Sequence, residues 1–326
     1  MPNKLILESS GSTGEPKRIL RSVESWTESV LRETEVFCLN NDERYAVAGS
    51  PSHSLWAYAH FRANYEQQPC LGISKFQSHA FKRLYEAKPS VLYSTPQIAA
   101  LCTATMVRDN QVVPSLHRLL LGGTALPENF PWDSQKKVFP NAQVWMFYGT
   151  AETSFIGYGE PREPYRLFPD VEIKIDKAQH LWVKSPMTVC PDQWIHTGDL
   201  VQWTNQRLKI IGRSQRQVIA GGKKFPVEPI ENFLEKVFKT DRVAIVQSCT
   251  GALVCVLVPN DQTNPQAHQM PQGLSSYELN KVIQHYFEGF PEMKGSCCLQ
   301  VAQWPVSKSG KTDWKAMQRI IDNLPV

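Results

Sequence analysis

Short aliphatic and β-branched runs alternate with amphipathic stretches over the first 212 residues of the chain. The runs occupy residues 45–49, 90–94, 116–122 and 142–147. Between them, one apolar helical face is marked by Val23, Trp26, Val30, Leu31 and Phe37, and residues 98–106 suggest another. Strands separated by helices predict a largely parallel α/β sheet. Ligands of such sheets bind at the carboxyl ends of the strands, so we expect the functional site there.

The pattern changes at residue 168 and again after residue 212. Between residues 168 and 203 the segments VEIKI, HLWVK and LVQW alternate apolar and polar positions, which predicts a small antiparallel β subdomain. Beyond residue 212, one helical face carries Ile230, Phe233, Leu234, Val237 and Phe238. Strand-like runs follow at 242–247, 253–258 and 299–304, with a loop at 259–275 and a second amphipathic helix at 277–287. We therefore predict a large α/β domain at residues 1–212 and a smaller α+β domain at residues 213–326.

Composition narrows the class of protein. The chain has 326 residues, of which 42% are hydrophobic and 20% charged, and this usage is typical of globular proteins. No apolar run reaches the roughly 18 residues that a membrane span needs, and the start lacks a signal-peptide pattern, so we expect a cytoplasmic protein without a membrane partner. A net charge of +4 is too small to indicate nucleic-acid binding. The eight cysteines lack metal-site or redox spacing and are predicted to be reduced core thiols.

The first chemical signal is the segment SSGSTGEPK at residues 9–17, directly after a short apolar run. Glycines let backbone N–H groups point into one concavity, hydroxyls add donors and the lysine supplies charge, a combination that suits a polyphosphate. An ordinary Ser/Gly-rich turn is the alternative. A Walker loop cannot be threaded through the segment. Near the other end, residues 309–312 (SGKT) imitate a Walker ending, but Pro305 occupies the position of the required glycine.

Seven segments, taken in order, resemble the adenylate-forming enzymes, which comprise acyl- and aryl-CoA synthetases, adenylation domains of peptide synthetases and luciferases. They are SSGSTGEPK (9–17), LGGTALP (121–127), FYGTAET (147–153), HLWVKSP (180–186), WIHTGDL (194–200), IIGRSQRQV (210–218) with the following GGKKFPVEPIE (221–231), and PVSKSGK (305–311). The collinear order across nearly the whole chain makes the resemblance specific. It implies a large α/β domain followed by a small mobile domain, and it implies ATP and Mg²⁺ as cofactors.

The resemblance assigns roles around the phosphates. Residues 9–17 correspond to the mobile phosphate loop, with the nucleotide-binding positions Ser10, Gly11, Ser12, Thr13, Gly14 and Lys17. In the segment that begins with Tyr148 and Gly149, the family places the hydroxyl of Thr150 on the α-phosphate and uses Glu152 to hold Mg²⁺, a hard cation suited to carboxylate oxygen. A helix N-terminal acid is the structural alternative for Glu152.

Further positions match the nucleotide and the two half-reactions. Asp199 corresponds to the residue that anchors the ribose, because one carboxylate can accept hydrogen bonds from both ribose hydroxyls. Arg213 corresponds to the arginine beside it. Gly122 and Gly123 are expected against the adenine plane. Lys311 matches the lysine that bridges ribose and the attacking carboxylate during adenylation.

The family then rotates its small domain about a hinge, which falls on Gln215, where an ionic latch is lost. In the second step the segment around Gly221 and Gly222 would approach a pantetheine arm.

The chain also departs from the family. Its phosphate loop begins at residue 9, whereas the family carries a long N-terminal subdomain first, so we expect a pared-down member whose exposed face is covered by a partner or a second copy of the chain. Residues 51–56 correspond to the acid pocket, where His53 and Trp56 could form an aromatic wall. Amino-acid-activating relatives keep an aspartate there and this segment has none, which favours an aromatic or fatty acid.

The leading hypothesis is an acid–thiol ligase that forms an acyl- or aryl-adenylate, releases pyrophosphate and acylates coenzyme A or the pantetheine of an acyl carrier protein. Basic residues such as Arg207, Arg216, Lys223 and Lys224 could serve either acceptor. The alternative is a catalytically reduced module that binds a nucleotide or acyl-adenylate and acts as a regulator or partner subunit. A generic P-loop ATPase is disfavoured by the Walker spacing, and a hydrolase by the absence of a GxSxG motif.

Overall fold

The computed structural model describes residues 4–10, 16–74, 78–214, 216–220, 223–238, 242–248, 253–257, 297–301, 303–305 and 312–322. The chain divides into two compact units. The first consists mainly of Pro16–Thr197 and Val201–Ile210, and the second mainly of Gly198–Leu200 and Ile211–Val326. The predicted loop at 259–275 and helix at 277–287 lie outside the described residues. The domain boundary at residue 212 stays a prediction.

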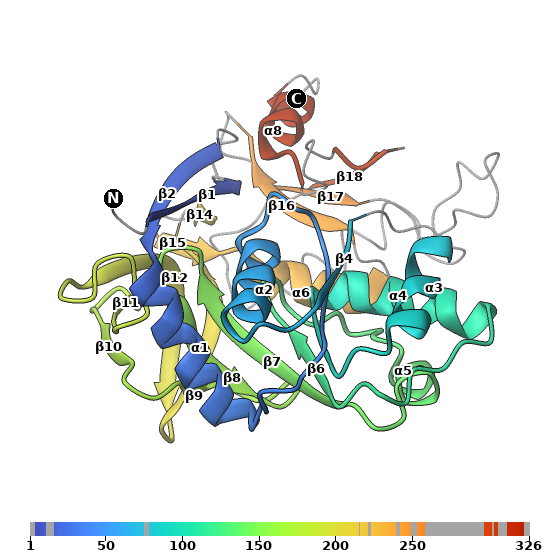
Figure 1. The fold of residues 1–326 in the computed structure, drawn as a ribbon. Coiled ribbons are helices and arrows are strands. Elements are labelled where there is room, and N and C mark those ends of the chain that lie inside the picture. Colours follow the sequence, from blue (N-terminus) through green and yellow to red (C-terminus); the bar gives the residue numbers. More distant parts are fainter. Residues whose placement is uncertain are drawn as a thin grey trace. The chain divides into compact units, whose positions relative to one another are not determined.

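A seven-stranded sheet forms the centre of the first unit, with the strand order β4-β3-β5-β6-β7-β8-β9. Its strands are β3 (Tyr45–Ala48), β4 (Cys70–Ile73), β5 (Val91–Ser94), β6 (Arg118–Leu121), β7 (Gln143–Thr150), β8 (Ser154–Gly159) and β9 (Arg166–Leu167). Figure 1 labels β4, β6, β7, β8 and β9 of this sheet. The neighbouring strands from β4 to β7 are parallel, whereas β8 and β9 are antiparallel to their neighbours. The parallel part confirms the predicted α/β class.

Helices cover both faces of this sheet (Figure 1). One face carries α1 (Val23–Phe37) and α2 (Ser54–Tyr65), and the other carries α3 (Ser78–Ala87), α4 (Pro96–Arg108) and α5 (Trp132–Val138). Successive residues of a strand point to opposite faces, so Tyr45 and Val47 of β3 join the core under α1 and α2, while Ala46 joins the core on the other face. Leu31 is 45% exposed, so it lies outside the buried stripe of α1 on which its spacing had placed it.

A buried polar network ties α1 and α2 to the sheet. Glu33 of α1 and Arg62 of α2 form an ion pair of 2.8 Å, and both side chains are fully buried. The hydroxyls of Tyr58 and Tyr93 donate to Glu33 over 2.7 and 2.8 Å. Arg62 also donates to the hydroxyl of Tyr45 over 3.0 Å. Burial raises the pKa of Glu33, and the charge of Arg62 opposes that shift. The network therefore compensates two buried charges with partners on four elements.

The first unit also contains a hairpin and most of a small sheet. The antiparallel hairpin consists of β1 (Lys4–Ser10) and β2 (Pro16–Ser22), and its Leu7 and Ile19 are buried in the core under α1 and α2. The small sheet has the order β10-β11-β12-β13, with β10 (Glu172–Ile175), β11 (His180–Lys184), β12 (Ile195–Thr204) and β13 (Arg207–Arg213). Strands β10 and β11 are antiparallel, as predicted. Leu181 and Val183 of β11 pack with Tyr148 and Ile156 of the central sheet.

The second unit combines a hairpin, a three-stranded sheet and helices. The hairpin pairs β14 (Gln217–Ala220) with β15 (Lys223–Pro226), and the sheet contains β16 (Val243–Gln247), β17 (Leu253–Leu257) and β18 (Cys297–Gln300). The helices are α6 (Glu228–Phe238), whose Ile230 and Leu234 are buried, and α8 (Trp314–Asp322). The strand predicted at 299–304 instead begins at Cys297 and ends at Gln300, parallel to β17.

Two expectations from composition can be compared with the fold. Among the described residues, no helix has the length and apolar character needed to cross a membrane. Cys102 and Cys255 are buried, but Cys38 and Cys190 are exposed, so the prediction of core thiols is wrong for these two.

Candidate functional site

Predicted site residues from three segments lie at the carboxyl ends of parallel strands. His53 follows β3 and is the N-cap residue of α2, Gly122 and Gly123 follow β6, and Thr150 is the last residue of β7. The backbone N–H of Gly122 donates to the carbonyl of Ser94 at the end of β5 over 3.1 Å. Because β3, β5, β6 and β7 are consecutive parallel strands of one sheet, these segments share one edge.

Gly122 makes room for an aromatic ring of the protein itself. A Cβ atom at this position would lie 2.3 Å from the ring of Phe147, a distance at which real atoms clash. Gly123 has a φ of +83°, a backbone conformation that favours glycine. Internal packing therefore requires the first glycine and backbone geometry favours the second. Their place against an adenine ring stays a prediction.

The turn between β7 and β8 presents Thr150 and Glu152. The Oγ1 atom of Thr150 lies 3.1 Å from that of Thr153 and accepts the backbone N–H of Thr153 over 3.2 Å. Thr153 is fully buried, so its hydroxyl anchors the turn on the side that faces the interior of the fold. A Cβ atom at Gly149 would lie 1.8 Å from the carbonyl oxygen of Ser154, so this turn closes only on glycine.

Tyr148 packs in the interior of the fold. Its side chain is buried in the core shared with the small sheet, and its ring centroid lies 5.8 Å from that of Tyr165. The tyrosine therefore supports the β7 strand from inside the fold. A direct nucleotide contact by Tyr148 stays a prediction.

An arginine that sequence reasoning missed holds the turn from the other side. Arg21 of β2 is 1% exposed, and its Nη1 atom donates to the carbonyl of Ala151 over 2.7 Å. Its Nη2 atom donates to the carbonyl of Met187 and, over 3.2 Å, to the hydroxyl of Ser25. The available signal is positional: in the hairpin, Arg21 shares a face with the inward-pointing Ile19, where a charged residue is unusual.

The turn has the donors that a magnesium–phosphate site uses. Mg²⁺ is commonly held in proteins by one or two carboxylates together with phosphate oxygens and water. Glu152 supplies one partly exposed carboxylate, and Thr150 supplies a hydroxyl two residues earlier on the same turn. Among the described residues, no group of three or more His, Cys, Asp or Glu side chains is arranged to hold a metal ion. The residues present fit Mg²⁺ bound together with a nucleotide.

Trp56 covers an edge strand. A Cβ atom at Gly72 of β4 would lie 2.5 Å from the indole of Trp56, which therefore lies directly on that glycine. The ring centroid of His60 lies 5.1 Å from the indole, and Trp56 is partly buried against the core under α1 and α2. Trp56 thus packs against the core and also lies on β4, the edge strand of the sheet. The acid-pocket roles of Trp56 and His53 stay predictions.

Asp199 and Arg213 pair within the second unit. The Oδ1 atom of Asp199 lies 2.7 Å from Nε of Arg213. Gly198 has a φ of +78°, and its carbonyl accepts the backbone N–H of Ser214 over 2.9 Å. This bond links β12 to the end of β13, so both predicted ribose-contacting side chains stand on one fixed piece of backbone.

Several predicted site residues lie outside the described residues. They are Gly11, Ser12, Thr13, Gly14, Gln215, Gly221, Gly222 and Lys311. For Ser10 and Lys17 only the backbone is described, in the hairpin register that pairs Ser10 with Pro16 and Ser9 with Lys17.

Arg216, which was a candidate contact for the acceptor, is engaged inside the second unit. Its two terminal nitrogens donate to the carboxylate of Glu231 over 2.9 and 2.6 Å. Its guanidinium carbon lies 3.8 Å from the ring centroid of Trp314. A guanidinium with a bidentate partner and a stacked ring has an internal structural role.

The comparison with protein families identifies the chain. The sequence profile of the AMP-binding enzyme family matches residues 5–186, which is more than half of the chain. The chain belongs to the AMP-binding enzyme family.

Two curated relatives of this AMP-binding enzyme are acyl-CoA ligases by name. The chain is 27% identical over 260 residues to a Staphylococcus haemolyticus (strain JCSC1435) protein provisionally named a long chain fatty acid-CoA ligase, an alignment that covers 73% of this chain and 55% of the relative. It is also 27% identical over 305 residues to an uncharacterised acyl-CoA ligase of Bacillus subtilis (strain 168), covering 83% of this chain and 62% of the relative. The matched region thus spans between 55% and 62% of these relatives.

A solved structure shares the fold. The o-succinylbenzoate coenzyme A synthetase of Bacillus subtilis, determined in complex with ATP and a magnesium ion, matches with a TM-score of 0.75. The match covers 98% of this chain and 69% of that chain at 17% sequence identity. At this identity the likeness establishes the fold alone.

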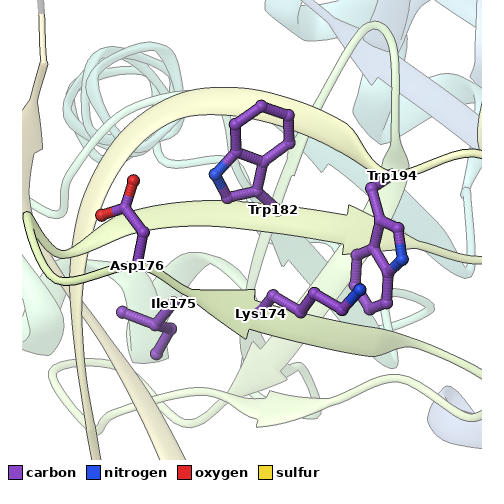
Figure 2. Close-up of a pocket in the computed structure, with 5 residues that line it drawn as sticks. All are labelled: Lys174, Ile175, Asp176, Trp182 and Trp194. Carbon is purple, nitrogen blue, oxygen red and sulfur yellow. The ribbon is translucent and has the colours of Figure 1, made fainter.

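A cavity of about 640 Å³ lies on the small sheet of this AMP-binding enzyme (Figure 2). Its lining residues are Lys174, Ile175, Asp176, Trp182 and Trp194. Lys174 pairs across the strands with Trp182, and its ammonium lies 3.8 Å from the ring centroid of Trp194. No residue predicted for the nucleotide or acid site lines this cavity.

Proposed function

We propose that this AMP-binding enzyme activates a carboxylic acid with ATP and passes the acyl group to a thiol. In the first step a carboxylate oxygen bonds to the α-phosphorus, the bond from that phosphorus to the bridging oxygen breaks, and pyrophosphate leaves with the electron pair. In the second step the deprotonated thiol bonds to the acyl carbon and AMP leaves. Both steps bring negative groups together, so a catalyst must align them and offset their charge.

The turn that carries Thr150 and Glu152 is the observation that supports this proposal most directly. Two residue types that suit an α-phosphate and Mg²⁺ stand two positions apart on one turn at the carboxyl end of β7, the edge where α/β sheets bind ligands. The hydroxyl of Thr150 is proposed to donate to an α-phosphate oxygen. The carboxylate of Glu152 is proposed to hold Mg²⁺, which supplies positive charge beside the phosphates.

The remaining roles follow from the positions of the motifs. The hairpin of β1 and β2 is proposed to carry the phosphate loop between Ser10 and Pro16. Asp199 is proposed to accept hydrogen bonds from the ribose hydroxyls. Lys311 is proposed to bridge ribose and the attacking carboxylate in the first step only. The proposed hinge at Gln215 then allows the second step to use the segment around Gly221.

The acid is proposed to be fatty or aromatic. The acid-pocket segment at residues 51–56 has no carboxylate to pair with an α-ammonium group, which disfavours amino acids. The names of a long chain fatty acid-CoA ligase and an o-succinylbenzoate coenzyme A synthetase among similar proteins support both remaining classes. These names also favour coenzyme A over a carrier protein as the thiol.

Acid-dependent release of pyrophosphate tests the proposal. The protein is incubated with ATP and Mg²⁺ and a panel of aryl, short-chain, long-chain and amino acids, with hydroxylamine as a surrogate acceptor. We expect release with one fatty or aryl class. Folded protein that binds ATP but releases no pyrophosphate with any acid would favour the alternative of a nucleotide-binding module.

Lys311→Ala separates the same two functions. For a ligase, we expect this variant to lose adenylation while it still transfers an acyl group from a supplied acyl-adenylate to a thiol. Lys315→Ala is the control, because Lys315 is an exposed lysine of α8 that lies close to Lys311 in the sequence. Equal effects of the two substitutions would contradict the proposed role of Lys311.

A further inference from the structure

Arg21 is a buried cation that contacts the turn carrying Glu152, the segment around Met187 and the first turn of α1. One terminal nitrogen holds the carbonyl of Ala151, and the other holds the carbonyl of Met187. Its Nε atom has no hydrogen-bond partner among the described residues. Burying a guanidinium is costly, and here its two terminal nitrogens donate to backbone carbonyls of two separate loops and to the hydroxyl of Ser25.

The same loops are tied to one another next to these contacts. The backbone N–H of Val189 donates to the carbonyl of Glu152 over 2.9 Å. The hydroxyl of Ser29 on α1 donates to that of Ser154 over 2.8 Å, one residue beyond the turn. Residues of β2, of α1 and of the segment around Met187 therefore all form hydrogen bonds with the turn or with Ser154 directly after it. Arg21 is the member of this set that contacts two loops at once.

Arg21 also connects the turn to the hairpin that leads into the predicted phosphate loop. It lies on β2 four residues after Lys17, in the strand whose first residue, Pro16, follows the loop. Ser22, the next residue, caps α1 by accepting the backbone N–H of Ser25 over 3.1 Å. One side chain thus joins the strand after the phosphate loop, the start of α1 and the turn with Thr150 and Glu152.

The charge of Arg21 persists at neutral pH. Burial lowers the pKa of Arg21 to about 10, and the nearby Tyr58 and Glu152 oppose that shift. A positive charge is therefore present beside the turn that carries Glu152.

We propose that Arg21 is a positioning residue for adenylation, which fixes the turn bearing Thr150 and Glu152 relative to the phosphate-loop hairpin. The inference rests on the proposed function, because it assigns Arg21 to the Mg²⁺–ATP step. Arg21 acts through the carbonyls of Ala151 and Met187 and contacts neither reactant. It is required for the half-reaction that uses ATP, and the transfer from a formed acyl-adenylate to a thiol proceeds without it.

The test compares Arg21→Met, Arg21→Lys and a matched control, Arg118→Met. Arg118 also donates to backbone carbonyls, those of Phe37 over 2.9 Å and His117 over 3.1 Å, but at the opposite end of α1. Three quantities are measured: the dissociation constant of ATP with and without Mg²⁺ by calorimetry, the kcat and KM of acid-dependent pyrophosphate release, and the rate of thiol acylation from a supplied acyl-adenylate.

For Arg21→Met we expect binding of ATP with Mg²⁺ to weaken and pyrophosphate release to slow by roughly 10- to 100-fold, the usual effect of removing a residue that orients a metal ligand. Thiol acylation and the KM for the acid are expected to change less than about threefold, and Arg118→Met to match the wild type in all three. Arg21→Lys, which keeps the charge but cannot fork between two carbonyls, is expected to fall between wild type and Arg21→Met.

Equal losses in both half-reactions, or unchanged binding of ATP with Mg²⁺, would overturn the inference and leave Arg21 a structural residue. If Arg21→Met does not fold, Arg21→Lys decides by the same criteria. Failure of the proposed function looks different: wild-type protein would then release no pyrophosphate with any acid, while the calorimetric comparison of wild type and variants would still test the positioning role.

Discussion

The carboxylate of Asp199 and the guanidinium of Arg213 form an ion pair of 2.7 Å in which the two partners have opposite exposure. The Asp199 side chain is 2% exposed, whereas that of Arg213 is 54% exposed. The carboxylate is thus held inside the fold by a cation that faces solvent. A buried carboxylate that accepts hydroxyl protons gives stronger hydrogen bonds than an exposed one, because water competes less.

Asp199→Asn is expected to weaken ATP binding by roughly 10- to 100-fold, because hydrogen bonds to a charged acceptor are worth about 1.5–3 kcal/mol. The KM for the acid is expected to stay within about threefold, since Asp199 is assigned to ribose alone. Calorimetric titration with ATP and steady-state pyrophosphate release measure the two quantities.

Asp176→Asn provides the matched control for Asp199. Asp176 belongs to the loop between β10 and β11, and its carboxylate accepts the backbone N–H of His180 over 2.9 Å and lies 2.9 Å from Nδ1 of the same residue. Its loss removes a paired carboxylate without touching the predicted nucleotide positions. Equal weakening of ATP binding by both substitutions would show that Asp199 acts through general electrostatics.

Gly122→Ala is expected to damage the site by displacing Phe147. The added methyl group would lie 2.3 Å from the phenyl ring, and overpacking of this kind costs about 1–3 kcal/mol. Both the free energy of unfolding and the affinity for ATP should fall. Denaturant titration and calorimetry on the same preparation check the two effects.

Two further variants separate packing from ligand binding at Gly122. Gly49→Ala is the control, because no described atom lies within 4 Å of a Cβ placed at this position beyond the end of β3. Combining Gly122→Ala with Phe147→Leu should restore stability by creating space. If that double variant also regains full ATP affinity, the glycine serves only the phenyl ring and no adenine lies against it.

The elements that could be predicted from sequence are those whose buried faces are apolar. Strands β3, β5 and β6 coincide closely with the aliphatic runs, because both of their faces are covered and every position is selected for apolar character. Helix α2 left no such trace, because its buried side includes the charged Arg62. Leu31 misled for the same reason, since the stripe of α1 that faces the sheet is completed by Ser29 and Glu33.

The residues of the candidate site also differ in whether the sequence could predict them. The positions of Thr150 and Gly122 at the ends of strands could be predicted from the aliphatic runs beside them, whereas their contacts with a ligand stay predictions. Arg21 and Arg216 could not be assigned, because a guanidinium bound to backbone carbonyls or to a distant carboxylate has no complementary pattern in the sequence. Only the fold brings their partners within reach.

Arg62→Met is expected to destabilise the first unit by about 3–5 kcal/mol, because it leaves the carboxylate of Glu33 buried without its cation. The tyrosine hydroxyls at Tyr58 and Tyr93 can still donate to Glu33, so the carboxylate would keep two of its partners. Chemical denaturation followed by tryptophan fluorescence measures the change.

Arg32→Met is the control for this ion pair. Arg32 pairs with Asp170, whose side chain is 56% exposed, over 2.5 Å. An exposed pair contributes at most about 1 kcal/mol, so this variant should remain close to wild type. Similar losses for Arg62→Met and Arg32→Met would contradict the view that burial makes the Glu33 network critical.

Glu228→Gln is expected to change how the stability of the second unit depends on pH. Burial raises the pKa of Glu228 above its ordinary value of 4.5, although Arg216 opposes the shift. Its Oε1 atom accepts the backbone N–H of Arg213 over 3.1 Å, while Oε2 has no hydrogen-bond partner among the described residues. A carboxyl whose pKa is raised by folding favours the folded state when protonated. Its contribution is therefore complete below its unfolded-state pKa and is lost as the pH rises through the folded-state pKa.

The wild type should thus lose more stability than Glu228→Gln between about pH 4 and pH 7, since an amide cannot ionise. Denaturant titrations of both proteins at several pH values across this range give the two slopes. Glu231→Gln is the contrasting variant, because Glu231 accepts both terminal nitrogens of Arg216 and the backbone N–H of Ile245 over 2.7 Å. Its loss should destabilise the protein throughout the neutral range. Parallel slopes for wild type and Glu228→Gln would mean that Glu228 ionises equally well in the folded and unfolded states.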